Sequence, residues 1–353
     1  MKSTSLMPAN PQVSVIVTAF NRHQYLESAV RSVLNQTLSR SLYEIIVVKN
    51  FRHPRTDNFL ETAGVKSISS SSVSEGAFLL EGLREARGRI ICFLDDDDEF
   101  SPDKLHTVCA AFESDPSLVF YHNGQLPIDF EGRAIGEKVG LRDTRTMIIR
   151  FRTPLTLMQM KALTSHKIDF NMSSISVCRE TIANNEGYMR SLRAGRETFV
   201  LACSLTERGC NIAGDSRKLT RYRVHSMSYS QVSLGTVSET TSLTKKYSSG
   251  LAILAGLELV GRMGSVLDDP AAKNYVYQKI TSTKLLLDGL AGVSGRIHML
   301  AALYDYLRYA YQSPDRRIIP RIAYIFGYLI SKRIARRLYL EDNKRAIYRL
   351  VSF

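Results

Sequence analysis

Residues 90–98 read IICFLDDDD, an apolar run that ends in four consecutive aspartates: Asp95, Asp96, Asp97 and Asp98. A short apolar run of this kind predicts a buried strand, and in an open α/β sheet such a strand ends at the edge where ligands bind. Carboxylates gathered there repel one another unless a cation lies among them. Hard divalent cations such as Mg²⁺ prefer oxygen ligands and accept substrate phosphates as further ligands. The stretch therefore predicts a site for a metal ion and a diphosphate.

A simpler interpretation is that the aspartates only precede a helix. Ser101-Pro102-Asp103 predicts a helix start, and acidic side chains are favourable at that end of a helix. The residues before the aspartates favour the metal site, because they predict alternating strands and helices. We expect strands at 13–17, 43–48 and 65–69 and helices at 24–38, 57–63 and 77–87. This order predicts an α/β protein with a parallel sheet.

The second half of the chain is less regular. It predicts strands at 117–122, 173–177 and 219–224, and a helix at 197–207 that Gly209 closes. Residues 142–165 predict helix plus loop. After a serine-rich linker at 226–243, the pattern is helical to the last residue.

Composition limits the class of protein and of partner. The 353 residues are 44% hydrophobic and 23% charged, which fits a globular protein with a full core. The net charge of +13 predicts an anionic partner, namely nucleotide phosphates, anionic lipid or nucleic acid. No helix-turn-helix, RNP or zinc pattern supports nucleic-acid binding. Five scattered cysteines predict neither a zinc site nor a disulfide framework. With no apolar segment at the start and no apolar run of spanning length, we expect a cytoplasmic protein.

Six segments resemble, in their order, those of family 2 glycosyltransferases, including archaeal members. They are VSVIVTAFNRHQYL (13–26), SVLNQT (32–37), YEIIVV (43–48), EARGRIICFLDDDD (85–98), the helix that ends at Gly209, and YRVH (222–225). The resemblance covers residues 12–230 and implies an inverting enzyme of the GT-A fold, with a Rossmann-like mixed, mainly parallel sheet flanked by helices. We divide the chain into a flexible arm (1–12), a catalytic domain (13–230) and a linker with a basic helical C-terminal region (231–353). The catalytic domain has a nucleotide-binding half (13–105) and an acceptor half (106–230).

The resemblance implies which residues hold a nucleoside-diphosphate sugar. Thr18, Ala19 and Phe20 occupy the loop that holds the nucleobase and ribose, and Arg22 lies at the same strand end. Where the family usually has two aspartates after the second strand, this chain has Lys49 and Asn50. Asn50 can accept a hydrogen bond from a ring N–H but can also donate one. Uridine is therefore favoured and guanosine stays open. Arg22 and Lys49 are candidates for neutralising the diphosphate.

The resemblance also implies the metal site and the base. Asp97 binds Mg²⁺ or Mn²⁺ directly, Asp95 or Asp96 contacts the ribose or a metal-bound water, and Asp95 is a further metal ligand. His225 lies near the diphosphate or the metal, and Asp98 caps the next helix. Glu197 takes the place of the base that deprotonates the acceptor hydroxyl, with Thr198 where the family usually has an aspartate. Alternatively, Glu197 only stabilises the first turn of its helix. Glu186 and Asp169 are other acid–base candidates.

Residues 308–353 carry eleven lysines and arginines against three acidic residues. Within them, 315–340 predicts an amphipathic helix that lies on the surface of an anionic membrane. A helix packed on the catalytic domain with a basic solvent face, or a homodimer contact, are the alternatives. If the membrane interpretation holds, the protein is peripheral on the inner face of the cell membrane.

The resulting hypothesis is a metal-dependent transfer of a sugar to a glycan, a polysaccharide or a lipid-linked acceptor. A polyprenyl-phosphate sugar synthase and a non-catalytic member that binds nucleotide-sugars or membrane stay open. A nucleotidyltransferase is disfavoured because residues 18–22 contain no glycine.

Overall fold

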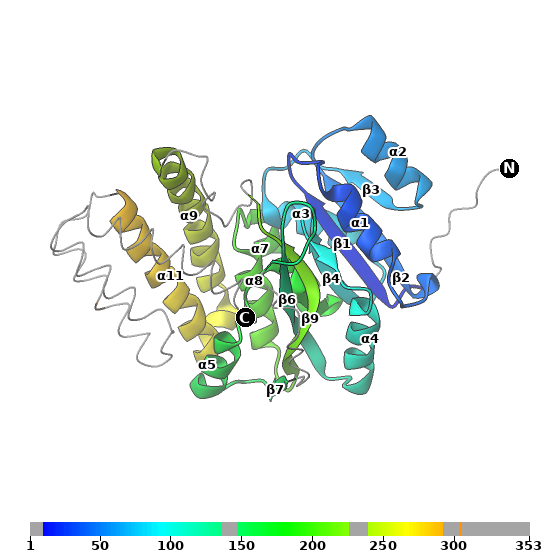
Figure 1. Ribbon diagram of the computed structural model, residues 1–353. Helices are drawn as coiled ribbons and strands as arrows, with labels where there is room; N and C mark the ends of the chain where they lie inside the picture. The colour runs from blue at the N-terminus through cyan, green and yellow to red at the C-terminus, as the bar shows by residue number, and fades with distance from the viewer. Residues whose placement is uncertain (1–9, 136–146, 226–238, 292–303, 305–353) are drawn as a thin grey trace.

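The computed structural model describes residues 10–135, 147–225, 239–291 and 304, which form a sheet flanked by helices (Figure 1). The strands are β1 (Val13–Ala19), β2 (Tyr43–Lys49), β3 (Lys66–Ser69), β4 (Ile90–Asp95), β5 (Glu99–Phe100), β6 (Leu118–Ile128), β7 (Ile148–Arg152), β8 (Ile175–Cys178) and β9 (Asn211–Arg223). The helices of the first half are α1 (Leu26–Leu34), α2 (Pro54–Thr62), α3 (Glu75–Glu85) and α4 (Lys104–Ser114). Those of the second half are α5 (Leu157–Ser165), α6 (Arg179–Ala183), α7 (Glu186–Ser191), α8 (Arg196–Thr206), α9 (Glu239–Gly261), α10 (Gly264–Asp268) and α11 (Pro270–Ala291). The predicted α/β class is confirmed.

The described strands form one mixed sheet in the order β3-β2-β1-β4-β8-β6-β9-β5, with β7 paired to β9. Neighbouring strands from β3 to β4 are parallel, as the alternating strands and helices predict. β8 is antiparallel to both β4 and β6, while β6 and β9 are parallel. The sheet therefore consists of a parallel half that matches the expected α/β order and a half of mixed direction.

Successive residues of the parallel strands bury their side chains on opposite faces of the sheet. In β1, Val15 and Val17 belong to the apolar cluster that includes residues of α1, α2 and α4. Ile16 belongs to the other apolar cluster, which includes residues of α3 and α8. Strands that are buried on both faces carry continuous apolar runs, which is why 13–17, 43–48 and 90–94 were recognisable as strands from the sequence.

Two elements differ from the expectation. Residues 148–152 form β7, whereas helix plus loop is expected there; its backbone pairs antiparallel with β9 from Ile148 to Arg152. The pairing with β9, which is distant in sequence, stabilises an edge strand whose residues are only partly buried. In addition, β9 begins at Asn211 instead of at 219, because its first residues pair with β6 and β7.

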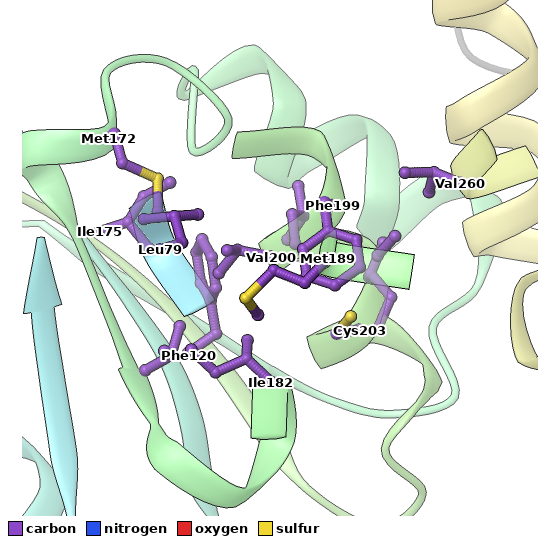
Figure 2. Packing of buried hydrophobic residues seen from close by; sticks show 14 of the residues in the cluster. Leu79, Phe120, Met172, Ile175, Ile182, Met189, Phe199, Val200, Cys203 and Val260 are labelled. Atoms are coloured by element: carbon purple, nitrogen blue, oxygen red, sulfur yellow. The ribbon is translucent and has the colours of Figure 1, made fainter. Parts of the chain in front are cut away.

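Helices α9, α10 and α11 pack on the side of α8 that faces away from α1 and α2 (Figure 1). Val260 of α9 belongs to the same apolar cluster as Phe199, Val200 and Cys203 of α8 (Figure 2). Met189 of α7, Ile182 of α6 and Phe120 of β6 belong to the same cluster. The division of the chain at residue 230 stays a prediction. The basic helix expected at 315–340 lies outside the described residues. Among the helices that are described, none combines the length and the apolarity that crossing a membrane requires.

Gly256 allows α9 to approach the segment that leads into α8. A Cβ atom at this position would lie 1.9 Å from the carbonyl oxygen of Ala194, far inside van der Waals contact. Any side chain at 256 therefore forces α9 and the Ala194 backbone apart. This contact fixes the chain just before Arg196 and Glu197.

We predict that Gly256→Ala lowers the free energy of unfolding by about 1–3 kcal/mol, because overpacking at a backbone contact displaces both segments. The measurement is the midpoint of urea unfolding, followed by circular dichroism. Gly264→Ala is the matched control, because a Cβ atom at 264 meets nothing within 4 Å. A Gly256→Ala protein as stable as the Gly264→Ala protein would show that the close approach does not matter.

Candidate functional site

The acidic residues lie where the carboxyl ends of β1 and β4 meet. Thr18 of β1 and Asp95 of β4 are opposite each other in the parallel register. The Asp96 backbone N–H donates to the carbonyl oxygen of Thr18 at 3.2 Å, so the chain turns out of the sheet directly after Asp95. The aspartates therefore project from the edge at which α/β sheets bind ligands.

Arg196, the first residue of α8, connects β1 and β4 to this helix. Its Nη2 lies 2.6 Å from Oδ1 of Asp95, and its Nη1 donates to the Thr18 hydroxyl at 2.9 Å. The Asp95 backbone N–H donates to the hydroxyl of Ser173 at 3.0 Å. Asp95 is thus held by contacts from two segments that lie far from it in sequence.

Arg22 binds the next two aspartates. Its Nε and Nη2 donate to both carboxylate oxygens of Asp96 at 2.8 and 2.6 Å, and Nη2 also lies 2.7 Å from Oδ2 of Asp97. Nε2 of His225 lies 2.9 Å from the same Asp97 oxygen. Burial raises the pKa of Asp96 to about 7, with Arg22 opposing the shift. Burial also acts to raise the pKa of Asp97, but His225 and Arg22 outweigh it and leave this pKa below its usual value.

Asp98 does not cap the following helix, and this expectation was wrong. Its Oδ1 accepts from the Arg223 backbone N–H and its Oδ2 from the side-chain amide of Asn171, both at 2.9 Å. Asp98 is almost completely buried, and this burial raises its pKa well above the usual range. The N-cap of α4 is Asp103, whose side chain makes no capping hydrogen bond. The backbone turns after β4, so Asp98 points inward and not toward α4.

Asp95, Asp97 and Asp98 could hold a metal ion, since each offers one carboxylate oxygen and these oxygens lie within 4.8 Å of one another. Three carboxylate oxygens fit Mg²⁺ or Mn²⁺ by ligand chemistry. Asp96 is not part of this set, and both of its oxygens accept from the Arg22 guanidinium. In this arrangement His225 is a partner of Asp97, and its assignment as a ligand stays a prediction.

Glu197 lies in the first turn of α8, next to Arg196. Its Oε1 is 3.8 Å from Nε of Arg196, a buried atom that has no hydrogen-bond partner among the described residues. Before this turn, the Gly195 backbone N–H donates to Glu75 at 3.1 Å, and Gly195 has a φ of 86°, which glycine adopts without strain. Burial raises the pKa of Glu197, with Arg196 opposing the shift. The arrangement gives a carboxylate that is joined to Asp95 through one guanidinium group.

The residues expected to hold the nucleobase lie in the loop after β1 and just after β2. Phe20 is about half exposed, at 47%, with its ring edge-on to Phe78 at a centroid distance of 5.8 Å, while Ala19 is buried. The Asn50 side chain exchanges two hydrogen bonds with Asn21, at 2.7 and 2.8 Å. These contacts place Asn50 beside the loop after β1, and its role toward a nucleobase stays a prediction.

Lys49 does not face the aspartates. Its Nζ lies 2.9 Å from Oδ1 of Asp57 and donates to the carbonyl oxygen of Phe51 at 2.8 Å. Asp57 lies in the first turn of α2. Because its ammonium group is buried against this turn, Lys49 is unavailable to a diphosphate, contrary to the expectation.

The alternative acid–base candidates, Glu186 and Asp169, also have side-chain partners. Glu186 pairs with Arg84 on the surface at 3.0 Å. Asp169 accepts from the Tyr275 hydroxyl at 3.0 Å and pairs with Lys279 at 2.5 Å. Sequence reasoning missed Arg196, although its position beside Glu197 was a usable signal. It also missed Tyr275 and Lys279, for which the sequence offers no pattern.

Comparison with known proteins relates the first part of this chain, which carries the four aspartates, to a known family. Residues 14–171 match the family model described as Glycosyl transferase family 2. Over 105 residues the chain is 30% identical to a putative teichuronic acid biosynthesis glycosyltransferase, TuaG, of Bacillus subtilis, which covers 27% of this chain and 39% of that protein. Over 169 residues it is 26% identical to the GalNAc(5)-diNAcBac-PP-undecaprenol beta-1,3-glucosyltransferase of Campylobacter jejuni, covering 44% and 54%. The matches to the first relatives thus span about a third to a half of their lengths.

A solved structure shares the fold over nearly the whole chain. TarS of S. aureus, residues 1–349 in complex with UDP, superposes with a TM-score of 0.53 and 14% sequence identity, covering 95% of this chain and 91% of that one. Residues 14–171 therefore carry the sequence pattern of glycosyl transferase family 2, and the chain has the GT-A fold of TarS.

Proposed function

We propose that this protein is a metal-dependent, inverting glycosyltransferase that moves a sugar from a nucleoside-diphosphate sugar to an acceptor hydroxyl. The observation that carries the proposal is the placement of Glu197 beside Arg196, which in turn binds Asp95 of the carboxylate set. A metal site alone would serve many reactions. A metal site joined to a second carboxylate at a helix start provides for both the leaving group and the attacking group of a sugar transfer.

On the donor side, Thr18, Ala19 and Phe20 border the carboxyl end of β1. The exposed face of Phe20 can stack on a nucleobase, since aromatic faces and bases attract each other. Uridine is the proposed base and guanosine the alternative. TarS, the neighbour in fold, has been crystallised with UDP and with UDP-GlcNAc.

Asp97, Asp95 and Asp98 would hold Mg²⁺ or Mn²⁺, which acts as a Lewis acid on the diphosphate when it is bound. Arg22 keeps Asp96 and Asp97 in place through three short contacts. His225 approaches Asp97 from the end of β9. The positive charge of Arg22 allows the carboxylates to lie close together before a ligand binds.

Glu197 acts as the general base. It accepts the proton of the acceptor hydroxyl as the oxygen attacks the sugar carbon from the face opposite the diphosphate. Its raised pKa brings the carboxylate closer to the pKa that is effective for a base at neutral pH. Arg196 keeps this carboxylate at the first turn of α8 and keeps Asp95 on the other side.

Acceptor and location follow from the chemistry of the relatives and from the charge of the chain. The Campylobacter jejuni relative is named for an undecaprenol-linked glycan. A glycan, polysaccharide or lipid-linked acceptor is accordingly proposed here, with the cytoplasm as the location. Attachment to an anionic membrane surface through 315–340, and a homodimer, are further proposals on residues outside the described part.

We predict that Asp97→Asn weakens the Mn²⁺-dependent binding of UDP by about 100-fold or more, since the amide replaces a charged ligand of the ion. Isothermal titration calorimetry with UDP, in the presence and absence of Mn²⁺, is the measurement. Asp268→Asn, at an exposed position of α10, is the control and should bind as the wild type does. Equal Mn²⁺-dependent affinity in the Asp97→Asn protein would exclude this metal site.

We predict that Glu197→Gln retains UDP and Mn²⁺ binding but lowers kcat by about 10²–10⁴-fold, the usual contribution of a general base. In the wild type, kcat should fall as the pH falls through the raised pKa of Glu197, because only the deprotonated form accepts a proton. Release of UDP from a UDP-sugar measures both effects. Glu186→Gln is the matched variant, and a loss of turnover there instead of at Glu197 would assign the base to Glu186.

A further inference from the structure

Helix α11 packs on α8, the helix that carries Glu197, although α11 is outside the stretch that matches the family model. Tyr275 and Lys279 are one helical turn apart on α11. The Tyr275 hydroxyl donates to Asp169 at 3.0 Å and is hydrogen-bonded to the side chain of Thr198, the residue after Glu197. Tyr275 therefore joins the α8 turn that carries Glu197 to the loop that carries Asp169.

Lys279 lies at the solvent-open end of this contact. Its Nζ is 2.5 Å from Asp169 and 5.4 Å from the centre of the Tyr275 ring. The side chain is 34% exposed, that of Asp169 15% and that of Glu197 29%. An ammonium group has three N–H donors, and Asp169 is its one ion-pair partner among the residues that the structure describes. The 34% exposure of its side chain makes Lys279 accessible to a ligand.

The charged side chains around Glu197 favour a sugar hydroxyl over a phosphate group as the acceptor. Glu197 and Asp169 each carry a carboxyl group, while Lys279 supplies one positive charge and Arg196 is bound to Asp95. A phosphate group would meet more negative than positive charge and would be repelled. A sugar hydroxyl is neutral, and it can accept from Lys279 while a neighbouring hydroxyl donates to Asp169. An acceptor hydroxyl also needs the base that Glu197 provides, whereas a phosphate oxygen does not.

We propose that Lys279 and Asp169 bind the hydroxyl groups of an acceptor sugar beside Glu197, with Tyr275 as the residue that positions them. The acceptor is then a carbohydrate and not the phosphate group of a polyprenyl phosphate. This inference rests on the proposed glycosyl transfer and deepens it, because it names the acceptor class and adds residues from the helical C-terminal region to the site.

The test uses the full chain with UDP and Mn²⁺, in four forms: wild type, Lys279→Gln, Lys279→Arg and Lys284→Gln. Lys284 is the matched control, because it lies on the same helix and pairs with Glu258 on α9. Saturation-transfer NMR measures binding of methyl glycosides of common hexoses and N-acetylhexosamines, and of decaprenyl phosphate in a detergent micelle. Hydrolysis of UDP-glucose and UDP-GlcNAc by water measures turnover without an acceptor.

We expect the wild type to bind at least one of the glycosides in preference to decaprenyl phosphate. Lys279→Gln should weaken this binding about tenfold, as expected for a lost hydrogen bond from a charged group. Lys279→Arg should restore part of it, and Lys284→Gln should equal the wild type. Donor hydrolysis by Lys284→Gln should stay within about twofold of the wild type, because Lys284 pairs with Glu258 on α9.

Binding of none of the glycosides, preference for decaprenyl phosphate, or equal glycoside binding by Lys279→Gln and the wild type would each overturn the inference. If the wild type hydrolyses a donor in these cases, the proposed glycosyltransferase activity stands and only the acceptor assignment fails. If the wild type neither binds UDP with Mn²⁺ nor hydrolyses any donor, the proposed function fails, and the inference that rests on it fails too.

Discussion

Four adjacent carboxylates at one edge of a sheet are the constraint on which the arrangement of the site depends. Their mutual repulsion must be balanced in the folded protein, and each of them is balanced differently. Asp95 binds a guanidinium from α8, Asp96 binds one from the loop after β1, and Asp97 adds the histidine that follows β9. Asp98 receives hydrogen bonds from a backbone N–H and an amide, and burial raises its pKa well above the usual range. The carboxylates can therefore lie together only after distant parts of the chain have folded against them.

The same contacts join segments that lie far apart in the sequence. Arg22 and His225 are 203 positions apart in sequence, yet both bind Asp97. Arg196 connects Asp95 to the turn that carries Glu197. A shift of α8 would therefore disturb both the carboxylate set and the proposed base. We infer that the position of the base relative to the metal site is fixed by one guanidinium group and by the packing behind α8, where Phe199 and Val200 contact the helices of the second half (Figure 2).

The sequence could predict those elements of the fold that depend on residues close together in the chain. The strands at 13–17, 43–48 and 90–94 are buried on both faces, so each is a mainly apolar run. Such a run can be recognised in the sequence without knowing which strands lie next to it. β7 lacks such a run, because it lies at the edge and is defined by pairing with β9. The roles that we expected for Lys49 and Asp98 were wrong for a related reason. The tertiary fold decides which partner a charged residue has. The sequence placed Arg196 beside Glu197 but could not reveal its contact with Asp95, which is 101 positions away.

The different extents of the two kinds of similarity can be explained in the same terms. The family match ends at residue 171, whereas the fold match covers 95% of the chain. Residues 14–171 carry the aspartates and the first loop, for which we propose the binding of a diphosphate and a nucleotide, groups that many enzymes share. Tyr275 and Lys279 lie beyond that limit and approach Glu197 from α11. If α11 contacts the acceptor as proposed, it has to keep its packing on α8, which requires only apolar side chains of suitable size. Its polar residues are free to change with the acceptor, so the fold persists where the sequence pattern does not.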